Sequence, residues 1–249
     1  MKYSKAPISE VILGISYKKP KIPVDFILKN ALFSDQFPIV EIVQPLFLEM
    51  LEGFQLEQIF DQNSGSFLVR RRTGDRKWLL QIQANMLYLN WIRLDTEPVG
   101  TYVGFPSIKD KFLSILAVLE DIAKVRIRDD VSLCDLTYHN RVKWQHEITD
   151  MSEIQKIMRI STPPKFSEQG YNNIFSRYTF HDFELKGFGL ININTATAID
   201  GEQLIKLESS LRGECSIDGD IDTWFEQAHK KQIGIFDQIF TEEIKAKWI

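Results

Sequence analysis

The sequence feature that most constrains the fold is a succession of short strand-like runs with tight turns between them. These runs cover residues 66–73, 77–83 and 86–93. The turns are Gly74-Asp75 and Ala84-Asn85, and connections this short join only antiparallel neighbours. A run rich in β-branched residues precedes them at 8–17. The first half of the chain therefore predicts a β-strand followed by a three-stranded β-meander.

Two helices are predicted in the same half. Pro38 suits the first turn of a helix that runs to about residue 53, although Pro45 inside that pattern indicates a later start or a kink. Residues 107–124 carry apolar side chains at helical spacing, and Ser107 is the predicted N-cap. The predicted order of elements is therefore strand, helix, three strands, helix.

The second half of the chain has the same predicted order. A strand, a short helix, three strands and a long C-terminal helix are expected at residues 131–144, 151–159, 174–181, 187–199, 202–212 and 220–248. Asp200-Gly201 is a strong hairpin signal between the last two of these strands. Because the order of elements recurs, we interpret the pattern as an internal duplication of architecture.

The resulting fold class is α+β, with two similar β-α-β-β-β-α halves, antiparallel sheets and helices packed on one side. We expect residues 1–249 to form one compact unit made of the halves 1–128 and 129–249. The two sheets would join edge to edge or pack as a pair with the helices outside. Joining would bury two unpaired strand edges and leave one sheet face without helices.

Composition and the absence of certain sequence patterns indicate what class of protein this is and where it is located. Hydrophobic residues make up 44% and charged residues 26% of the 249 positions, which is an ordinary globular balance. The two cysteines, Cys134 and Cys215, have no CxxC spacing and predict neither zinc nor a redox pair. The N-terminus does not read as a signal peptide, and no window is long and apolar enough for a membrane helix. We therefore expect a soluble cytoplasmic protein with no membrane partner.

The common catalytic and cofactor motifs are absent from the sequence. No GxxxxGK[ST], GxGxxG, GxSxG or HExxH pattern occurs, and the four histidines are not spaced as a metal-binding pair. We therefore predict no catalytic residue, no cofactor and no metal. The sequence leaves open whether the protein is an enzyme, although the missing motifs argue against it.

A polar stripe along the predicted meander is the best sequence indication of a ligand site. Gln81 and Gln83 alternate on one strand, and Tyr88 and Asn90 share a face of the next. The ligand-binding residues that we predict are Arg70, Arg72, Gln81, Gln83, Tyr88, Asn90 and His139. Amides and a tyrosine on a sheet face could line a groove, whereas the alternative is the solvated face of a sheet covered on one side.

Basic and aromatic residues give two further indications. The run Arg70–Arg72 forms a basic hairpin with Arg76 and Lys77, which would contact phosphate or an acidic partner, or would protect a strand edge from aggregation. We expect Trp91 and Arg93 to share one face and to add an aromatic–basic surface. The aromatic side chains of the last helix are typical of a core or a dimer contact.

Several short motifs make the chain resemble a known family. They are the opening Pro7-Ile8, Glu10-Val11 and Gly14-Ile15, the strand Gln81-Ile82-Gln83, the pair Asn90-Trp91, the run Thr137-Tyr138-His139-Asn140, and Ala228-His229 followed by Phe236. In this order they resemble a sporadically distributed family of bacterial proteins of about this length and of uncharacterised function. The resemblance implies a bacterial protein encoded by mobile genes, which often serve defence, toxin–antitoxin or phage-related functions. It implies no catalytic residues.

Two functions are compatible with these sequence features. The first is a non-catalytic binding or regulatory protein that works with a protein partner or as a homo-oligomer. The second is a sensor or enzyme that binds a nucleotide or RNA on the open sheet face. The net charge of −4 does not favour nucleic acid, because such proteins usually carry a basic surface.

Overall fold

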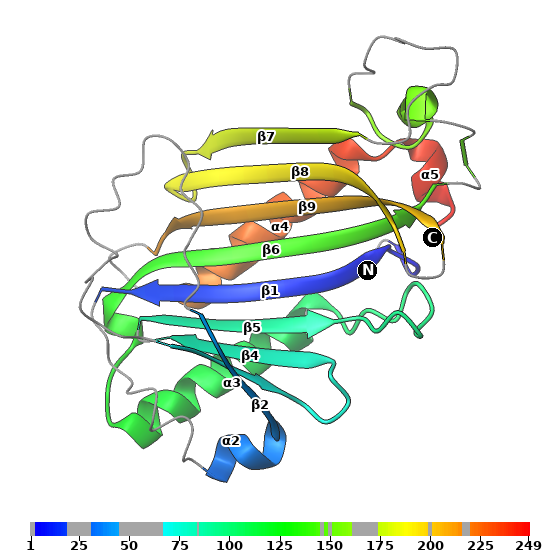
Figure 1. Cartoon of the computed structure of the whole chain (residues 1–249). Coiled ribbons are helices and arrows are strands. Elements are labelled where there is room, and N and C mark those ends of the chain that lie inside the picture. The colour runs from blue at the N-terminus through cyan, green and yellow to red at the C-terminus, as the bar shows by residue number, and fades with distance from the viewer. Residues whose placement is uncertain are drawn as a thin grey trace.

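Nine antiparallel strands form one continuous sheet across the molecule (Figure 1). The computed structural model describes residues 3–18, 31–44, 67–83, 85–144, 147–148, 151–160, 174–198, 201–215 and 220–249. The strands are β1 (Ile8–Tyr17), β2 (Ile39–Val43), β3 (Leu68–Arg72), β4 (Trp78–Gln83), β5 (Met86–Ile92), β6 (Val131–Lys143), β7 (Phe175–Asp182), β8 (Gly187–Thr197) and β9 (Gln203–Glu214). The protein is therefore α+β with a large antiparallel sheet.

The strand order is β2-β3-β4-β5-β1-β6-β9-β8-β7. Strands β1 and β6 lie at the centre and pair with each other, with Leu13 opposite Leu136. Outward from this pair, β1 is followed by β5, β4 and β3, and β6 is followed by β9, β8 and β7. The two predicted meanders thus flank two central strands, and the sheet is joined at its middle by the first strand of each half.

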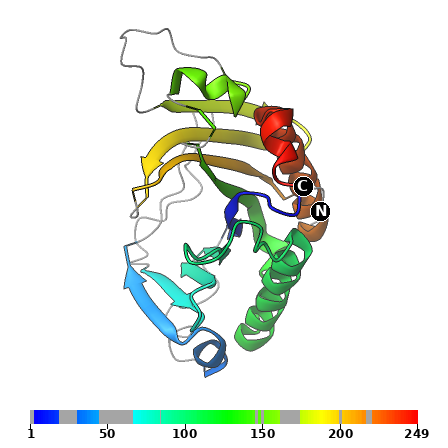
Figure 2. The same cartoon turned by 90° about the vertical axis from the view of Figure 1, so that its right-hand side faces the viewer.

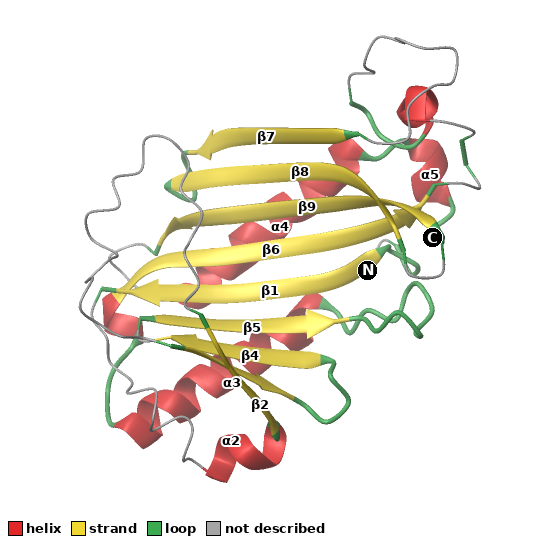
Figure 3. Cartoon of the chain, in the orientation of Figure 1, coloured by secondary structure: helices red, strands yellow, loops and turns green. Residues whose placement is uncertain are grey.

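The helices pack on one side of this sheet (Figures 1 and 3). In the described residues they are α2 (Ala31–Gln36), α3 (Phe105–Ala123), α4 (Ile221–Ile239) and α5 (Glu242–Ala246), with short 3₁₀ turns at Arg128–Asp130 and Met151–Lys156. Helix α3 contacts β1, and α4 contacts β6 and β9. Figure 2 shows the outer strands of both halves bending away from these helices.

The hydrophobic core lies between the helices and the sheet. Alternate residues of β1, Val11, Leu13 and Ile15, are fully buried on the helix side. They pack with the apolar stripes of α3 and α4, among them Phe112 and Phe225, whose rings meet edge to face at 5.4 Å. The apolar side chains that alternate along the strand and those at helical spacing on the helices therefore pack into the same core.

Most predicted strands are confirmed, but three sequence predictions about helices were wrong. The helix expected from Pro38 is strand β2 at Ile39–Val43, where a run of β-branched residues pairs with β3. The part of that prediction beyond residue 44 lies outside the described residues. Helix α3 begins at Phe105 behind the N-cap Gly104, two residues before the predicted Ser107.

The third error concerns the C-terminal helix, which is two helices rather than one. Helix α4 ends at Ile239, and Phe240 adopts an extended backbone that forms an isolated bridge with Met158. The side chain of Thr241 then accepts a hydrogen bond from the Ile244 backbone and caps α5. A threonine N-cap at this point offers the backbone an alternative to a continuous helix.

Candidate functional site

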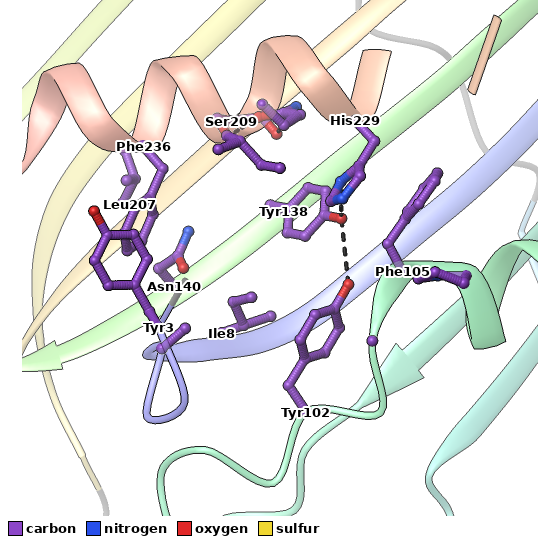
Figure 4. Close-up of a pocket in the computed structure, with 15 residues that line it drawn as sticks. Tyr3, Ile8, Tyr102, Phe105, Tyr138, Asn140, Leu207, Ser209, His229 and Phe236 are labelled. Atoms are coloured by element: carbon purple, nitrogen blue, oxygen red, sulfur yellow. Dashed lines mark hydrogen bonds between the residues drawn. The ribbon is translucent and has the colours of Figure 1, made fainter. Parts of the chain in front are cut away.

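A cavity of about 410 Å³ lies on the helix side of the sheet, between the start of α3 and the middle of α4 (Figure 4). Strands β1, β6 and β9 form its floor through Ile8, Tyr138 and Leu207. It is also lined by Tyr3, Ala6, Tyr102, Gly104, Phe105, Pro106, Asn140, Ser209, His229, Gln232, Ile233 and Phe236. Its size is within the range of small-molecule sites in proteins.

The start of α3 shapes one wall of this cavity. Gly104 has a φ of 89°, which a residue with a side chain rarely adopts, and this turn brings Tyr102 and Phe105 to the cavity. Phe105 then stacks on the imidazole of His229, with ring centroids 4.0 Å apart and planes 11° from parallel. The glycine therefore allows the loop and the helix to meet α4 at this point.

Three polar groups meet at this wall. The hydroxyls of Tyr102 and Tyr138 lie 3.3 Å apart, and the Tyr138 hydroxyl is 2.8 Å from Nδ1 of His229 (Figure 4). They come from the loop before α3, from β6 and from α4. Because each hydroxyl can donate or accept, Tyr102 can offer a ligand either a hydrogen or a lone pair.

Burial keeps this cluster uncharged. It lowers the pKa of His229 to about 4 and raises the pKa of the Tyr138 and Tyr102 hydroxyls. At neutral pH the imidazole is therefore neutral and both phenols keep their protons. None of the other residues that line the cavity carries a charge at neutral pH.

A different polar group lies at the opposite end of the cavity. The side chain of Asn140 is on the helix side of β6 and only 2% exposed. Its Oδ1 atom is buried and has no hydrogen-bond partner. Nearby, Tyr3 donates to Asp237 at 2.6 Å, so its hydroxyl is occupied. Asn140 is thus an acceptor without a donor at the edge of an empty space, where a buried polar group normally has a partner.

Gln232 fixes α4 over the cavity floor. Its Nε2 donates to the carbonyls of Leu136 at 3.0 Å and Ser209 at 2.9 Å, and its Oε1 accepts from the Ser209 hydroxyl at 2.5 Å. All three contacts are buried, and they join α4 to both β6 and β9. The amide of Gln232 is therefore occupied and holds the walls in place.

The rim of the cavity is apolar. Ile233 on α4 is 46% exposed, and Pro106 at the start of α3 is also exposed. Val103, next to the lining residues Tyr102 and Gly104, is 44% exposed. An entering molecule would pass between these side chains, from the solvent into the space between α3 and α4.

The seven predicted ligand residues lie on the other face of the sheet. The strand registers put Arg70, Gln81 and Tyr88 in one cross-strand row, and Arg72 and Asn90 in the next row. His139 lies on the same face but in the second half, beside Glu10 and Glu208. Gln83 is at the far end of β4. The structure therefore places all seven on one face without bringing them to one point.

Three of these residues bind one another in a hydrogen-bonded chain. Arg70 Nε donates to Gln81 at 3.0 Å, Gln81 donates to Asn90 at 2.9 Å, and Asn90 donates to Glu10 at 2.6 Å. Arg72 lies 3.7 Å from Glu41 on the edge strand. The polar groups of this chain are thus largely satisfied by the protein itself.

The alternative prediction, that these polar residues lie on a solvent-exposed sheet face, was wrong for four of the seven residues. Gln81, Gln83, Tyr88 and Asn90 are all buried. Tyr88 lies over Gly14, where a Cβ atom would come within 2.0 Å of its ring, so the glycine makes the space for it. Burial raises the pKa of the Tyr88 hydroxyl.

Two predictions about surface patches were also wrong. The basic run is divided between the two faces, because Arg71 is buried on the helix side and donates to the Phe37 carbonyl at 3.2 Å. Trp91 is likewise buried in the core, where its ring meets Tyr102 edge to face at 5.2 Å. Alternation along a strand separates neighbours in sequence, so consecutive arginines do not make one patch.

Sequence reasoning missed the cavity residues as a site. Tyr138 and Asn140 belong to the run that carries the family resemblance, and His229 to the Ala-His motif, but neither motif predicted a ligand site. The missing information is that a loop, a strand and a helix far apart in sequence meet at this point. Among the residues that the structure describes, no group of three or more His, Cys, Asp or Glu side chains could hold a metal ion.

Comparisons of the chain with protein-family models, with curated proteins and with solved structures found no match. In the described part of the chain, no helix combines the length and the apolar character needed to span a membrane. The site must therefore be interpreted from its own geometry.

Proposed function

We propose that the protein is a non-catalytic binding protein that holds a small, uncharged, largely aromatic molecule between α3 and α4. The observation that carries this proposal is the cavity itself, an aromatic-lined space with an unpartnered buried acceptor, Asn140 Oδ1. Pockets of this kind, mostly apolar with a few placed polar groups, are typical of small-molecule sites.

The charge state of the lining supports an uncharged ligand. His229 is neutral because burial lowers its pKa to about 4, and Tyr138 stays protonated. An ion entering this cavity would lose its hydration without meeting an opposite charge among the lining residues. A general base works best with a pKa near the working pH, so this cluster supports binding rather than proton transfer.

The arrangement of polar groups also indicates what the ligand carries. A hydroxyl or N–H donor would satisfy Asn140 at one end, and a hydroxyl or carbonyl would meet Tyr102 at the other. Between these ends, the rings of Phe105, Tyr138 and Phe236 favour an aromatic body.

The neutral aromatic dye N-phenyl-1-naphthylamine tests this proposal, because its fluorescence rises in apolar surroundings. We expect saturable binding to the wild-type protein. The Ile233→Trp variant narrows the rim at an exposed position and should weaken dye binding by roughly tenfold. Ile42→Trp, the same change at an exposed position of β2, should leave binding unchanged.

Equal dye binding by the wild type and Ile233→Trp would contradict the proposal, as would no binding at all. A folded variant is recognised by an unchanged circular dichroism spectrum and melting temperature, since both substitutions are at exposed sites.

The family resemblance supports a regulatory role, in which a filled cavity is the signal. Helix α4 contributes His229, Gln232 and Phe236 to the cavity, so a ligand would act directly on this helix. A protein partner or a second copy of the chain would then bind differently to the protein with a filled cavity. Co-purification with the product of the neighbouring gene, with and without ligand, tests this part; a chain that stays alone in both conditions argues against it.

The alternative, a nucleotide- or RNA-binding sensor on the opposite face, has less support. Arg70, Gln81 and Asn90 already bind one another, which leaves few free groups for a ligand.

The finer fold prediction is a separate proposal: we infer that the halves 1–128 and 129–249 derive from a duplication. The matching strand orders outward from β1 and β6 support it, whereas among the described strands β2 has no counterpart beyond β7.

A further inference from the structure

A depression of about 860 Å³ lies beside the first residues of β1, separate from the cavity. Lys5 and Pro7 line it from the N-terminal segment, Arg93 follows β5, and Arg141 and Lys206 come from β6 and β9. The segment 3–8 lies between the two spaces, because Tyr3, Ala6 and Ile8 line the cavity. Its carbonyl and amide groups are held by the sheet and by the C-terminus.

Two arginines flank the start of β1 in this depression. The Arg93 backbone donates to the Ser9 carbonyl at 2.9 Å on one side of the strand. The Arg141 backbone donates to the Pro7 carbonyl at 2.9 Å on the other side. The sheet therefore fixes the backbones of both arginines beside the same short segment, and both residues line the depression.

Arg93 is the unusual member of this pair. Its Nη1 atom is buried and has no hydrogen-bond partner. Burial lowers the pKa of Arg93, and among its charged neighbours Arg141 has the largest effect, in the same direction, ahead of the opposing effects of Asp95 and Glu97. Arg93 is half-buried, and a half-buried guanidinium with an unpartnered buried donor and a second arginine nearby favours an anion as partner.

The acidic residues around the depression are already paired. Asp95 binds Arg141 at 2.6 Å, Glu97 binds Lys77 at 2.5 Å, Glu202 binds Lys143 at 2.5 Å, and Glu147 binds Lys247. Within the described part of the chain, no ion pair is formed by Lys5, Arg93 or Lys206, all of which line the depression. Positive charge is therefore left over at this place in a chain whose net charge is −4.

We propose that Arg93, Arg141 and Lys206 form a binding site for the phosphate group of a small molecule. Guanidinium groups donate two parallel hydrogen bonds to phosphate oxygens, and a lysine adds a point charge. A small phosphate fits better than a nucleic acid, because three basic residues in one depression match a single phosphate group, whereas the net charge of −4 disfavours an extended polyanion. This site does not depend on the cavity or on its proposed ligand.

Isothermal titration calorimetry in a phosphate-free buffer at fixed ionic strength tests the site. One titration uses inorganic phosphate, a second ribose 5-phosphate and a third a nucleoside monophosphate. We expect saturable binding of at least one of them below about 10 mM. Arg93→Gln and Lys206→Gln should each weaken it by roughly tenfold, because each removes a charge-assisted contact.

Arg126→Gln is the matched control, since Arg126 is an exposed arginine paired with Asp129 three residues away. It should bind like the wild type. Lys206 is exposed, so its variant keeps the test valid if Arg93→Gln fails to fold. Tighter binding of one ester than of inorganic phosphate would support a site that also contacts the organic part of the molecule.

Three outcomes would overturn the proposal: no binding of any phosphate compound, equal binding by Lys206→Gln and Arg126→Gln, or binding of single-stranded RNA with no binding of small phosphates. The dye experiment on the cavity is independent, so failure of either site is recognised separately.

Discussion

The two faces of the sheet bury polar groups in different ways. On the face opposite the helices, Arg70, Gln81, Asn90 and Glu10 form a continuous chain of hydrogen bonds. On the helix side, Asn140 is equally buried and lines the cavity, but its Oδ1 has no hydrogen-bond partner. The comparison teaches that a row of polar residues on a sheet can be structural, whereas an unpartnered polar residue that lines an aromatic cavity indicates a ligand.

The largest expected effect comes from removing a buried ion pair on the face opposite the helices, in the second half of the sheet. Asp135 accepts from Arg212 through both Nε, at 2.8 Å, and Nη2, and its side chain is 6% exposed. Asp135→Ala removes the carboxylate partner of a largely buried arginine and should lower the free energy of unfolding by about 3–5 kcal/mol. Urea unfolding measures it. Asp129→Ala, in an exposed pair with Arg126, should cost less than about 1 kcal/mol; equal losses would refute the contrast.

The same substitution on each face gives the sharpest comparison. Asn90→Leu removes a residue that links Gln81 to Glu10 and should cost about 1–3 kcal/mol, because it leaves both partners unsatisfied. Asn140→Leu removes an acceptor that has no partner, so its effect should lie within about 1 kcal/mol of zero. Urea unfolding of the two variants side by side measures the difference; similar losses would mean that Asn140 also has a structural partner.

The cavity should also give a pH-dependent stability through His229. The pKa of His229 is about 4 in the folded protein, below its ordinary value near 6.5, because burial disfavours the charged form. The unfolded chain therefore binds this proton first, so stability is complete above about pH 6.5 and falls as the pH drops toward 4. We expect a loss of about 1–2 kcal/mol after allowing for the partial exposure of the ring.

Unfolding at pH 7 and pH 5 measures this effect, and His229→Phe is the comparison. The variant keeps a ring for Phe105 to stack on but cannot titrate. It should lose less stability than the wild type between the two pH values. A loss of the same size in both would assign the pH dependence to other groups.

The smallest expected effect belongs to the outer hydroxyl of the cavity cluster. The contact between Tyr102 and Tyr138 is long at 3.3 Å, and Tyr102 is partly exposed. Tyr102→Phe should therefore cost about 0.5 kcal/mol or less in stability. Thermal melting measures this change. The variant should nevertheless bind a ligand with a hydroxyl or carbonyl group less tightly, which separates a role in binding from one in folding.

Local sequence patterns predicted most of the secondary structure, because they report interactions between near neighbours. The tight turn at Gly74-Asp75 and the alternation in 77–83 and 86–93 were sufficient for the meander. The same reasoning failed at Ile39–Val43, where pairing with β3 decided the strand, and at Thr241, where a cap divided the last helix. Local signals of comparable strength compete at these places, and the tertiary partner selects between them.

By itself, the sequence determined the α+β class, eight of the nine described strands and the common face of the seven polar residues, because strand alternation is a local property. Only the tertiary structure decided that these residues satisfy one another, and that Tyr102, Tyr138, Asn140 and His229 surround an empty space. The physical reason is distance along the chain. The cavity depends on how a loop, a strand and a helix pack together, with a separation of 36 residues between Tyr102 and Tyr138 and of 91 between Tyr138 and His229, and no local pattern encodes that packing.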